Sequence, residues 1–290
     1  MPANQADPTL TYVLGHSERE LERLAIQARL IDPITRGFFR DAGIISGMRV
    51  LDVGSGSGDT AFLAAALVGE TGEVVGVDRA FAAVVAARRR ADALSLPNVS
   101  FLQGDPAGMT FEQPFDAVVG RYVLVFQPDP AAMLQKLVAQ VRPGGVVAFH
   151  EPDFDSERSY PAAPTYGRCC RWVVETLRLS GADPRMGIKL CATFVAAGLP
   201  APSLRLESVI TGGATSADHV QFKTELARTL VPEMERFKVA TASEIDIETL
   251  AERMLAEVIA TGSVIVGRSE IGAWTRVSHD PSSSPSLTRR

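Results

Sequence analysis

The fold of this chain is decided by the stretch Val50-Leu-Asp-Val-Gly-Ser-Gly-Ser-Gly-Asp59. Its apolar first half predicts a buried β-strand at 49–53, and its glycines predict a tight turn that opens a helix. Glycine in such a turn lets the backbone approach a ligand closely. A second predicted strand, at 74–77, ends in Asp78, whose carboxylate can accept hydrogen bonds from ribose hydroxyls. The combination predicts a nucleoside-binding site.

Downstream of this turn, short apolar segments alternate with helical patterns as far as residue 151. Such alternation predicts an α/β fold with a Rossmann-like, doubly wound and mostly parallel sheet that helices cover on both faces. Strands are expected at 49–53, 74–77, 99–102, 115–120 and 146–149, and helices at about 59–68, 80–94 and 129–141.

The chain divides into four predicted parts. These are N-terminal helices at 1–44, the nucleoside-binding core at 45–151, a substrate cap with the last sheet strands at 152–277, and a tail at 278–290 that is expected to be disordered. The N-terminal part is expected to hold a helix from a capping box at 17–20 to about residue 30, and a short helix at 34–42. The cap is expected to hold helices at 165–179, 189–197, 217–235 and 243–260, a strand at 204–210, and a hairpin of 263–266 and 272–277.

Composition and charge exclude several classes of protein. The 290-residue chain has a formal net charge of −5, which gives no electrostatic support to nucleic-acid binding. No apolar run approaches the ~18 residues of a membrane span, and residues 1–8 lack the basic and apolar regions of a secretory signal. Three cysteines without paired spacing predict neither a disulfide framework nor a zinc site. We therefore expect a cytoplasmic protein without a metal, a membrane or a nucleic acid as partner.

The spacing of the glycines distinguishes between nucleoside cofactors. Gly54, Gly56 and Gly58 form Gly-x-Gly-x-Gly, whereas the dinucleotide fingerprint Gly-x-Gly-x-x-Gly requires a glycine at 59, where this chain has Asp59. A carboxylate at a helix N-terminus would repel a pyrophosphate, but it suits a ligand with a positive charge or an amino group. The loop resembles motif I of the class I S-adenosylmethionine-dependent methyltransferases, in which it embraces the amino-acid half of the cofactor.

Further segments match that family in order, over about residues 45–151. Asp78 corresponds to the acid that binds the ribose hydroxyls, Asp105 to the acid or amide beside the adenine, and residues 120–124 to the segment on the methionine side. The turn Arg142-Pro-Gly-Gly145 is typical of the small-molecule members. The resemblance implies a seven-stranded sheet with an N-terminal helical lid and a helical cap after the fifth strand. It also implies S-adenosylmethionine as cofactor, S-adenosylhomocysteine as product, and cofactor contacts from Asp52, Gly54, Ser55, Gly56, Gly58, Asp59, Asp78, Arg79, Gly104, Asp105, Pro106, Arg121 and Tyr122.

The segment at residues 12–20 is similar to the lid helix of many small-molecule methyltransferases. The resemblance implies that Tyr12 lies over the methionine end of the cofactor, with His16 and Gln27 nearby and His16 on the substrate side. The alternative is that Tyr12 anchors the helix and His16 lies on the surface.

The fifth predicted strand is expected to deliver His150 and Glu151 to the same rim. A neutral histidine can deprotonate a hydroxyl, a phenol or an amine, and a neighbouring carboxylate can orient it. His150 is therefore the predicted general base and Glu151 its orienting partner, and both are expected to contact the substrate together with Tyr122. Methyl transfer does not require a base, because a sulfonium is a strong electrophile and positioning supplies much of the acceleration. A structural role for His150 is the alternative.

The leading interpretation is a small-molecule methyltransferase, most similar to the ubiquinone, menaquinone and secondary-metabolite methyltransferases. Its acceptor is expected to be a small apolar or aromatic molecule in an enclosed pocket, with transfer to O, N or C left open. Two alternatives remain. One is an enzyme that binds S-adenosylmethionine but catalyses a cyclisation or rearrangement, and the other is an NAD-dependent oxidoreductase, which conflicts with Asp59. The cap helices are candidates for a homodimer interface.

Overall fold

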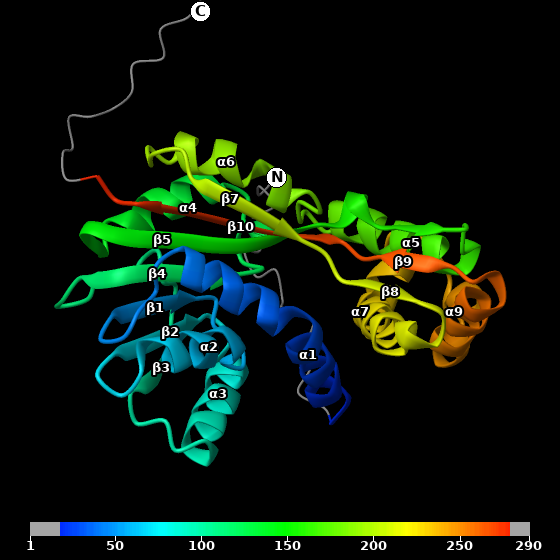
Figure 1. The fold of residues 1–290 in the computed structure, drawn as a ribbon, viewed down its shortest axis with the longest axis horizontal. Coiled ribbons are helices and arrows are strands. Elements are labelled where there is room, and N and C mark those ends of the chain that lie inside the picture. Colours follow the sequence, from blue (N-terminus) through cyan, green and yellow to red (C-terminus); the bar gives the residue numbers. More distant parts are fainter. Residues whose placement is uncertain (1–17, 279–290) are drawn as a thin grey trace, which may run out of the picture.

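The core of the molecule follows the strand–helix alternation of the sequence (Figure 1). The structure, a computed structural model, describes residues 18–278. The core elements are α1 Glu18–Asp41, β1 Arg49–Val53, α2 Asp59–Val68, β2 Glu73–Asp78, α3 Phe81–Ala93, β3 Val99–Gln103, β4 Phe115–Arg121, η1 Leu124–Phe126, α4 Pro130–Val138, β5 Val141–Asp153, α6 Met186–Ala196, β7 Ser203–Glu207 and β10 Ser269–Arg276.

The main sheet has seven strands in the order β3-β2-β1-β4-β5-β10-β7. β1 is parallel to both β2 and β4, and the pairs β2–β3 and β4–β5 are parallel as well. β10 runs antiparallel to its neighbours β5 and β7. The predicted seven-stranded, mostly parallel sheet is therefore confirmed. The strand order reverses between β1 and β4, and in such sheets ligands bind beyond the carboxyl ends of the strands at this switch point.

Helices cover both faces of the sheet. Side chains alternate between the two faces of a strand, and along β1 Val50 joins one buried core cluster while Leu51 and Val53 join the other. The first cluster contains side chains of α1, α2 and α3, and the second contains side chains of α4, α5 and α6. Buried apolar contacts on both sides therefore fix the strand ends, where the polar residues of interest lie.

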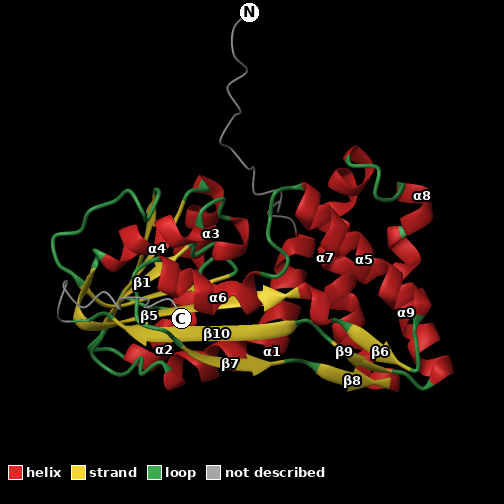
Figure 2. Ribbon diagram, turned by 90° about the horizontal axis from the view of Figure 1, so that it is seen from above, coloured by secondary structure: helices red, strands yellow, loops and turns green. Residues whose placement is uncertain are grey.

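A cap lies beyond the carboxyl ends of β4 and β5 (Figures 1 and 2). Its helices α5, α7 and α9 pack on one another, and a three-stranded sheet of order β6-β9-β8 runs along one side. α1 lies between cap and core and contacts both α2 and α7 (Figure 1). The cap elements are η2 Phe154–Ser156, β6 Arg158–Tyr160, α5 Pro164–Leu179, β8 Ile210–Gly212, η3 Gly213–Ser216, α7 Ala217–Arg236, α8 Ala242–Ile245, α9 Ile247–Thr261 and β9 Val264–Val266.

α1 is one continuous helix, so the predicted division into two helices is wrong. Pro33 lies inside it, although proline removes a helical hydrogen bond. The helix continues because its second half is held by packing: Phe38 and Phe39 are 2% and 1% exposed. Gly272 of β10 provides the space, since a Cβ there would lie 2.5 Å from Cγ of Phe38.

The predictions for the last third of the chain are partly wrong. The predicted strand at 204–210 divides into β7 and β8, which belong to different sheets. β9 and β10 do not form the predicted hairpin, because β9 pairs with β6 and β8 whereas β10 pairs with β5 and β7. α6 packs on β5 and β10 of the main sheet. Between residues 18 and 278, no helix is long and apolar enough to cross a membrane.

Candidate functional site

The turn between β1 and α2 is built from glycines in the left-handed region. The φ angles of Gly54, Gly56 and Gly58 are +64°, +52° and +96°, which side chains rarely adopt. A Cβ at Gly54 would lie 2.8 Å from Cγ2 of Val123, and one at Gly58 would lie 2.8 Å from Cζ of Phe62. A Cβ at Gly56 would meet no atom within 4 Å. Space for a ligand beside this backbone is therefore present at Gly56.

Asp52, at the carboxyl end of β1, is a buried acid without a cationic or side-chain hydrogen-bond partner among the described residues. Its side chain is 0% exposed, and neither carboxylate oxygen has a hydrogen-bond partner within the described residues. Burial raises its pKa well above the usual range; Arg121 and, more weakly, the nearby backbone N–H of Ala61 oppose the rise, while Asp78 and Asp59 add to it. The hydroxyl of Ser55 is also buried without a partner. An acid in this position lacks the cationic donor that would compensate for its burial.

Asp78 and Asp105 lie at the carboxyl ends of β2 and β3, next to the end of β1. The carboxylate of Asp78 accepts hydrogen bonds of 2.8 Å from the backbone N–H groups of both Gly56 and Ala80. Asp105 forms an ion pair of 3.0 Å with Arg79 at the surface. The N–H of Gly104 donates to the carbonyl oxygen of Asp78 at 2.9 Å, which holds the two turns together. A carboxylate has lone pairs for further donors, so Asp78 can still accept from a ligand.

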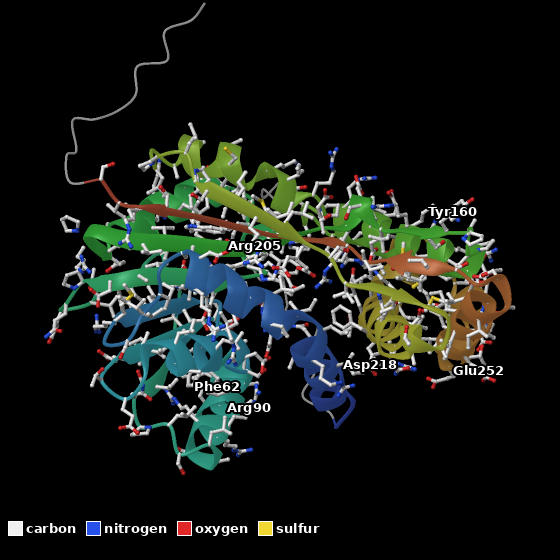
Figure 3. The ribbon with its side chains drawn as sticks, viewed as in Figure 1. Phe62, Arg90, Tyr160, Arg205, Asp218 and Glu252 are labelled. Carbon is white, nitrogen blue, oxygen red and sulfur yellow. The ribbon has the colours of Figure 1, made fainter. Side chains whose placement is uncertain are left out.

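Asp59 does not offer the free carboxylate that the sequence suggests. Its Oδ1 accepts a hydrogen bond of 2.7 Å from Arg90 of α3, whose other nitrogen donates to the carbonyl oxygen of Ser57 at 2.7 Å. The Arg90 guanidinium also lies 5.1 Å from the ring centroid of Phe62, and Figure 3 places both side chains beside α2 and α3. Asp59 therefore fixes the turn, and the acid left to meet an amino group is Asp52.

A buried network of polar side chains occupies the ends of β4, β5 and β10. His150 Nε2 lies 2.8 Å from Oε2 of Glu270, and the same oxygen accepts a 2.9 Å hydrogen bond from the Tyr122 hydroxyl. Arg268 donates to Glu270 at 2.7 Å and to the Tyr122 oxygen at 2.8 Å. On its other side, His150 Nδ1 lies 3.0 Å from the Thr35 hydroxyl of α1. The network therefore joins the helix α1 to the sheet.

Arg121 secures α1 at a second point. The guanidinium of this 8% exposed arginine donates to Asp32 at 2.6 Å and to Thr35 at 3.1 Å. About one turn before Asp32 in α1, Arg29 pairs with Asp218 of α7 at 3.1 Å. Gln27 is 9% exposed on the same helix. Tyr12 and His16 lie outside the described residues, so their predicted contacts stay predictions.

His150 has no free ring nitrogen in this arrangement. Both nitrogens lie within hydrogen-bond distance of neighbours, the side chain is 0% exposed, and the rings of Phe38 and Tyr122 pack against its edges at centroid distances of 4.9 and 5.3 Å. Burial lowers the pKa of His150, against the opposing influence of Glu270. A neutral, fully enclosed imidazole is suited to positioning its neighbours.

Glu151 is not the partner of His150, so that prediction is wrong. Its carboxylate accepts hydrogen bonds of 2.8, 2.7 and 3.2 Å from the backbone N–H groups of Val123, Leu124 and Val125. Burial raises the pKa of Glu151 to about 8, although these N–H groups oppose the rise. Consecutive residues of a strand point to opposite faces, so Glu151 shapes the η1 turn while Glu270 orients His150.

A small cavity of about 20 Å³ lies between α1, α7 and the start of β10. Its wall combines apolar side chains with buried polar ones: Leu30, Ile31, His219, Phe222, Lys223 and Glu270. The Lys223 ammonium donates to Glu157 at 2.7 Å, and both side chains are at most 3% exposed. Burial lowers the pKa of His219 to about 4. The cavity lies beside the polar network, and its volume is enough for about one water molecule.

Several residues of this site escape prediction from the sequence. Glu270, Arg268, Lys223 and Asp32 belong to segments far from the glycine turn, and none stands in a recognisable motif. The available signal is weaker: Arg268 and Glu270 are charged residues inside an otherwise apolar strand pattern at 264–273. Charged residues are rarely buried unless paired, so their position in such a pattern marks a buried ionic site.

Comparisons with known proteins agree with this geometry. A family model described as a methyltransferase domain matches residues 44–178. The chain is 32% identical over 146 residues to the aklanonic acid methyltransferase DauC of a Streptomyces species, covering 50% of this chain and 66% of that protein, just under two thirds of its length. It is also 32% identical over 198 residues to a 2-phytyl-1,4-naphtoquinone methyltransferase of Synechococcus elongatus, covering 64% of this chain and 79% of that one.

Solved structures show the same fold. A putative methyltransferase from Bacillus halodurans superposes with a TM-score of 0.54 at 17% identity, covering 84% of this chain and 98% of that one. Taken with the sequence matches, the fold and the glycine turn define a Rossmann-like methyltransferase core. The chain belongs to the methyltransferase family.

Proposed function

We propose that this protein is an S-adenosylmethionine-dependent methyltransferase that acts on a small apolar or aromatic molecule in an enclosed site. The observation that carries the proposal is the orphaned carboxylate of Asp52, which is 0% exposed at the end of β1 beside a glycine turn with open space at Gly56. A cofactor with an amino group and a sulfonium would provide the missing cation. The pyrophosphate of NAD would add negative charge beside three acids.

The residues present fit the cofactor along its length. Asp52, Ser55 and the turn at 54–58 would hold the amino-acid end, Asp78 the ribose hydroxyls, and Arg79 with the segment 104–106 the adenine side. S-adenosylmethionine supplies an electrophilic methyl group and leaves as S-adenosylhomocysteine. The contribution of the chain is to bind both reactants, align them and exclude water, which can supply most of the acceleration for such a transfer.

The covering of the sheet by α1 and the names of the relatives support the choice of acceptor. α1 contacts β5, β10 and α7, and the apolar side chains of Leu30, Ile31 and Phe222 line the small cavity between α1 and α7. The names of the relatives in Streptomyces and Synechococcus refer to aklanonic acid and to a 2-phytyl-1,4-naphtoquinone. Both are compatible with an apolar, aromatic acceptor for this chain.

One experiment tests the proposal directly. The protein is incubated with methyl-labelled S-adenosylmethionine and a metabolite extract, and mass spectrometry follows both products. We expect a labelled small molecule and an equal amount of S-adenosylhomocysteine. A product of altered structure without S-adenosylhomocysteine would favour the cyclisation alternative. A thermal shift with NAD but none with S-adenosylmethionine would contradict the proposal.

Adding one methyl group at Gly56 separates binding from folding. Gly56→Ala should cost about 1–2 kcal/mol in folding stability, because an L-residue is strained at φ +52°, yet the added Cβ meets no protein atom. We expect S-adenosylmethionine affinity to fall at least tenfold, measured by calorimetry, because the methyl group occupies ligand space. Gly213→Ala is the control: its φ is +53°, its surroundings are equally open, and it lies in the cap. Equal affinities of both variants would remove Gly56 from the cofactor site.

His150→Gln distinguishes a positioning role from a general base. A glutamine amide can keep contacts with both Thr35 and Glu270, the partners of His150, but it cannot accept a proton in this way. We expect kcat at saturating substrates to stay within about tenfold of wild type, whereas loss of a general base costs about 10²–10⁴-fold. His150→Ala, which removes both contacts, should lose more activity and stability than His150→Gln. A loss of 10³ in His150→Gln would restore the base role.

A further inference from the structure

A second hollow lies on the outside of the cap, apart from the glycine turn. It is a groove of about 570 Å³ between α5 and the segment 154–159, which contains η2 and the start of β6. This volume is in the range of sites that hold small organic ligands. Its floor is formed by Phe154, Tyr166, Cys170 and Val174, of which the first three are at most 8% exposed. The groove therefore offers an apolar floor to a ligand.

One face of α5 keeps this groove open. Gly167, Arg171, Val174 and Arg178 recur at helical spacing and all line it. Glycine destabilises a helix relative to alanine, and here the fold does not require it: a Cβ at Gly167 would meet only Nη1 of Arg171, at 3.6 Å. The backbone at Gly167 is helical, without a positive φ angle. A glycine at this position leaves the groove clear of a side chain.

The charges at the rim leave an excess of positive charge. Each acid of the wall has a cationic partner: Asp155 pairs with Arg185 at 3.4 Å, Glu157 with Lys223 at 2.7 Å, and Glu175 with Arg178 at 2.9 Å. Arg158 and Arg171 also line the groove, and within residues 18–278 neither has a carboxylate partner. Arginine binds carboxylate and phosphate groups in a planar, two-pronged geometry.

Only a layer of side chains separates the groove from the small cavity. Glu157, itself 2% exposed, lines both hollows. Tyr166 of the groove floor lies with its hydroxyl 3.3 Å from Nε2 of His219, which lines the cavity. The ring of Phe154 lies 4.9 Å from the Arg268 guanidinium, a member of the polar network. The groove therefore lies directly outside the small cavity and the polar network.

We propose that this groove is the outer part of the acceptor site and binds an organic anion: an apolar or aromatic body on the floor, with a carboxylate or phosphate between Arg158 and Arg171. The assignment as an acceptor site rests on the proposed methyltransferase function, because the reacting end would have to pass the Glu157–Lys223 pair to approach the polar network at Glu270. The binding of the anion itself does not depend on that function. Glu157 and Lys223 form the boundary between the two parts.

The binding step is tested by calorimetry on the full chain without S-adenosylmethionine, with three probes of one shape: 2-naphthoate, 2-naphthyl phosphate and neutral 2-naphthamide. We expect saturable binding of at least one anion, at least tenfold tighter than the amide; which anion binds better distinguishes carboxylate from phosphate recognition. The double variant Arg158→Gln/Arg171→Gln should lose at least tenfold in affinity, and Gly167→Leu, which fills the groove, should lose as much. Arg168→Gln, on α5 but outside the groove, should bind as wild type.

Equal affinity for the amide and the anions, unchanged affinity of the double variant, or no saturable binding would overturn the groove as an anion site. Gly167→Ala serves as the folding control, and its melting temperature should equal or exceed that of wild type. In the labelled extract, Gly167→Leu should lose the labelled product while retaining S-adenosylmethionine affinity. Undiminished product in that variant would overturn the link to the acceptor and leave methyl transfer intact. Absence of product from wild type would count against the proposed function. The binding of the three naphthyl probes would then still test the groove as an anion site.

Discussion

Asp52→Asn should weaken S-adenosylmethionine binding by about 100-fold and at the same time raise the melting temperature of the ligand-free protein. A hydrogen bond to a charged group contributes about 1.5–3 kcal/mol, and tenfold in affinity corresponds to about 1.4 kcal/mol. Without ligand, the same carboxylate is 0% exposed and has no partner among the described residues. An amide of the same shape removes the cost of burying its charge.

The stability gain from Asp52→Asn should depend on pH. Burial raises the folded pKa of Asp52 above its ordinary value of 3.8. The folded protein holds the proton of Asp52 more tightly than the unfolded chain does. The stability that results is fully present below pH 3.8 and is lost as the pH rises through the raised folded pKa. The gain in melting temperature should be larger at pH 8 than at pH 5, as measured by scanning calorimetry.

Asp129→Asn is the matched control for Asp52→Asn. Asp129 caps α4 by accepting from the Ala132 N–H at 2.9 Å, and asparagine caps a helix equally well. The control should change neither affinity nor melting temperature appreciably. If Asp52→Asn bound the cofactor as tightly as wild type, Asp52 would not be its counter-ion; if stability did not rise, its buried charge would be compensated by a group outside residues 18–278.

Glu270→Gln should destabilise the protein by about 3–5 kcal/mol, the usual cost of removing one partner from a buried ion pair. Glu270 is 1% exposed and accepts from His150, Tyr122 and Arg268. Its loss leaves the Arg268 guanidinium, 8% exposed, without its carboxylate. Urea unfolding measures the loss. Glu73→Gln, which breaks the exposed Arg49 pair, should cost at most about 1 kcal/mol.

In the wild-type protein, lowering the pH should remove the contribution of ionised Glu270 to folding stability. Burial opposes ionisation of Glu270, but Arg268 and His150 overcome this effect and lower its pKa from 4.5 to about 2. The contribution of Glu270 is therefore present above about pH 4.5 and is lost as the pH falls toward 2. Wild type should lose stability over this interval more steeply than Glu270→Gln. Parallel stability curves for the two proteins would show that Glu270 is not ionised in the network.

The sequence predicts the core well because local signals and the fold agree there. The mostly apolar segment 50–53 directly before the glycines predicts a buried strand, and three glycines at alternate positions predict a turn with positive φ angles, which the structure has at Gly54, Gly56 and Gly58. The place of Asp78 in the site could also be predicted, because the ends of neighbouring parallel strands lie side by side. In the structure the Asp78 carboxylate accepts a hydrogen bond from the Gly56 N–H.

The acid beside His150 could not be predicted in this way. Glu270 lies 120 residues away, and its approach depends on the antiparallel pairing of β10 with β5, in which Gly272 stands opposite His150. Sequence proximity favours Glu151, but the alternation of a strand sends that side chain to the other face. The continuity of α1 through Pro33 likewise depends on tertiary packing, in which Phe38 fits over Gly272.

A crystal structure of the complex with S-adenosylhomocysteine tests the proposed cofactor site most directly. We expect the amino group of the ligand to lie within about 3.2 Å of the Asp52 carboxylate, or to reach it through one water, with the ribose hydroxyls at Asp78 and the chain of the ligand passing Gly56. A ligand bound with the adenine at Asp52, or bound away from the turn at 54–58, would contradict the assignment.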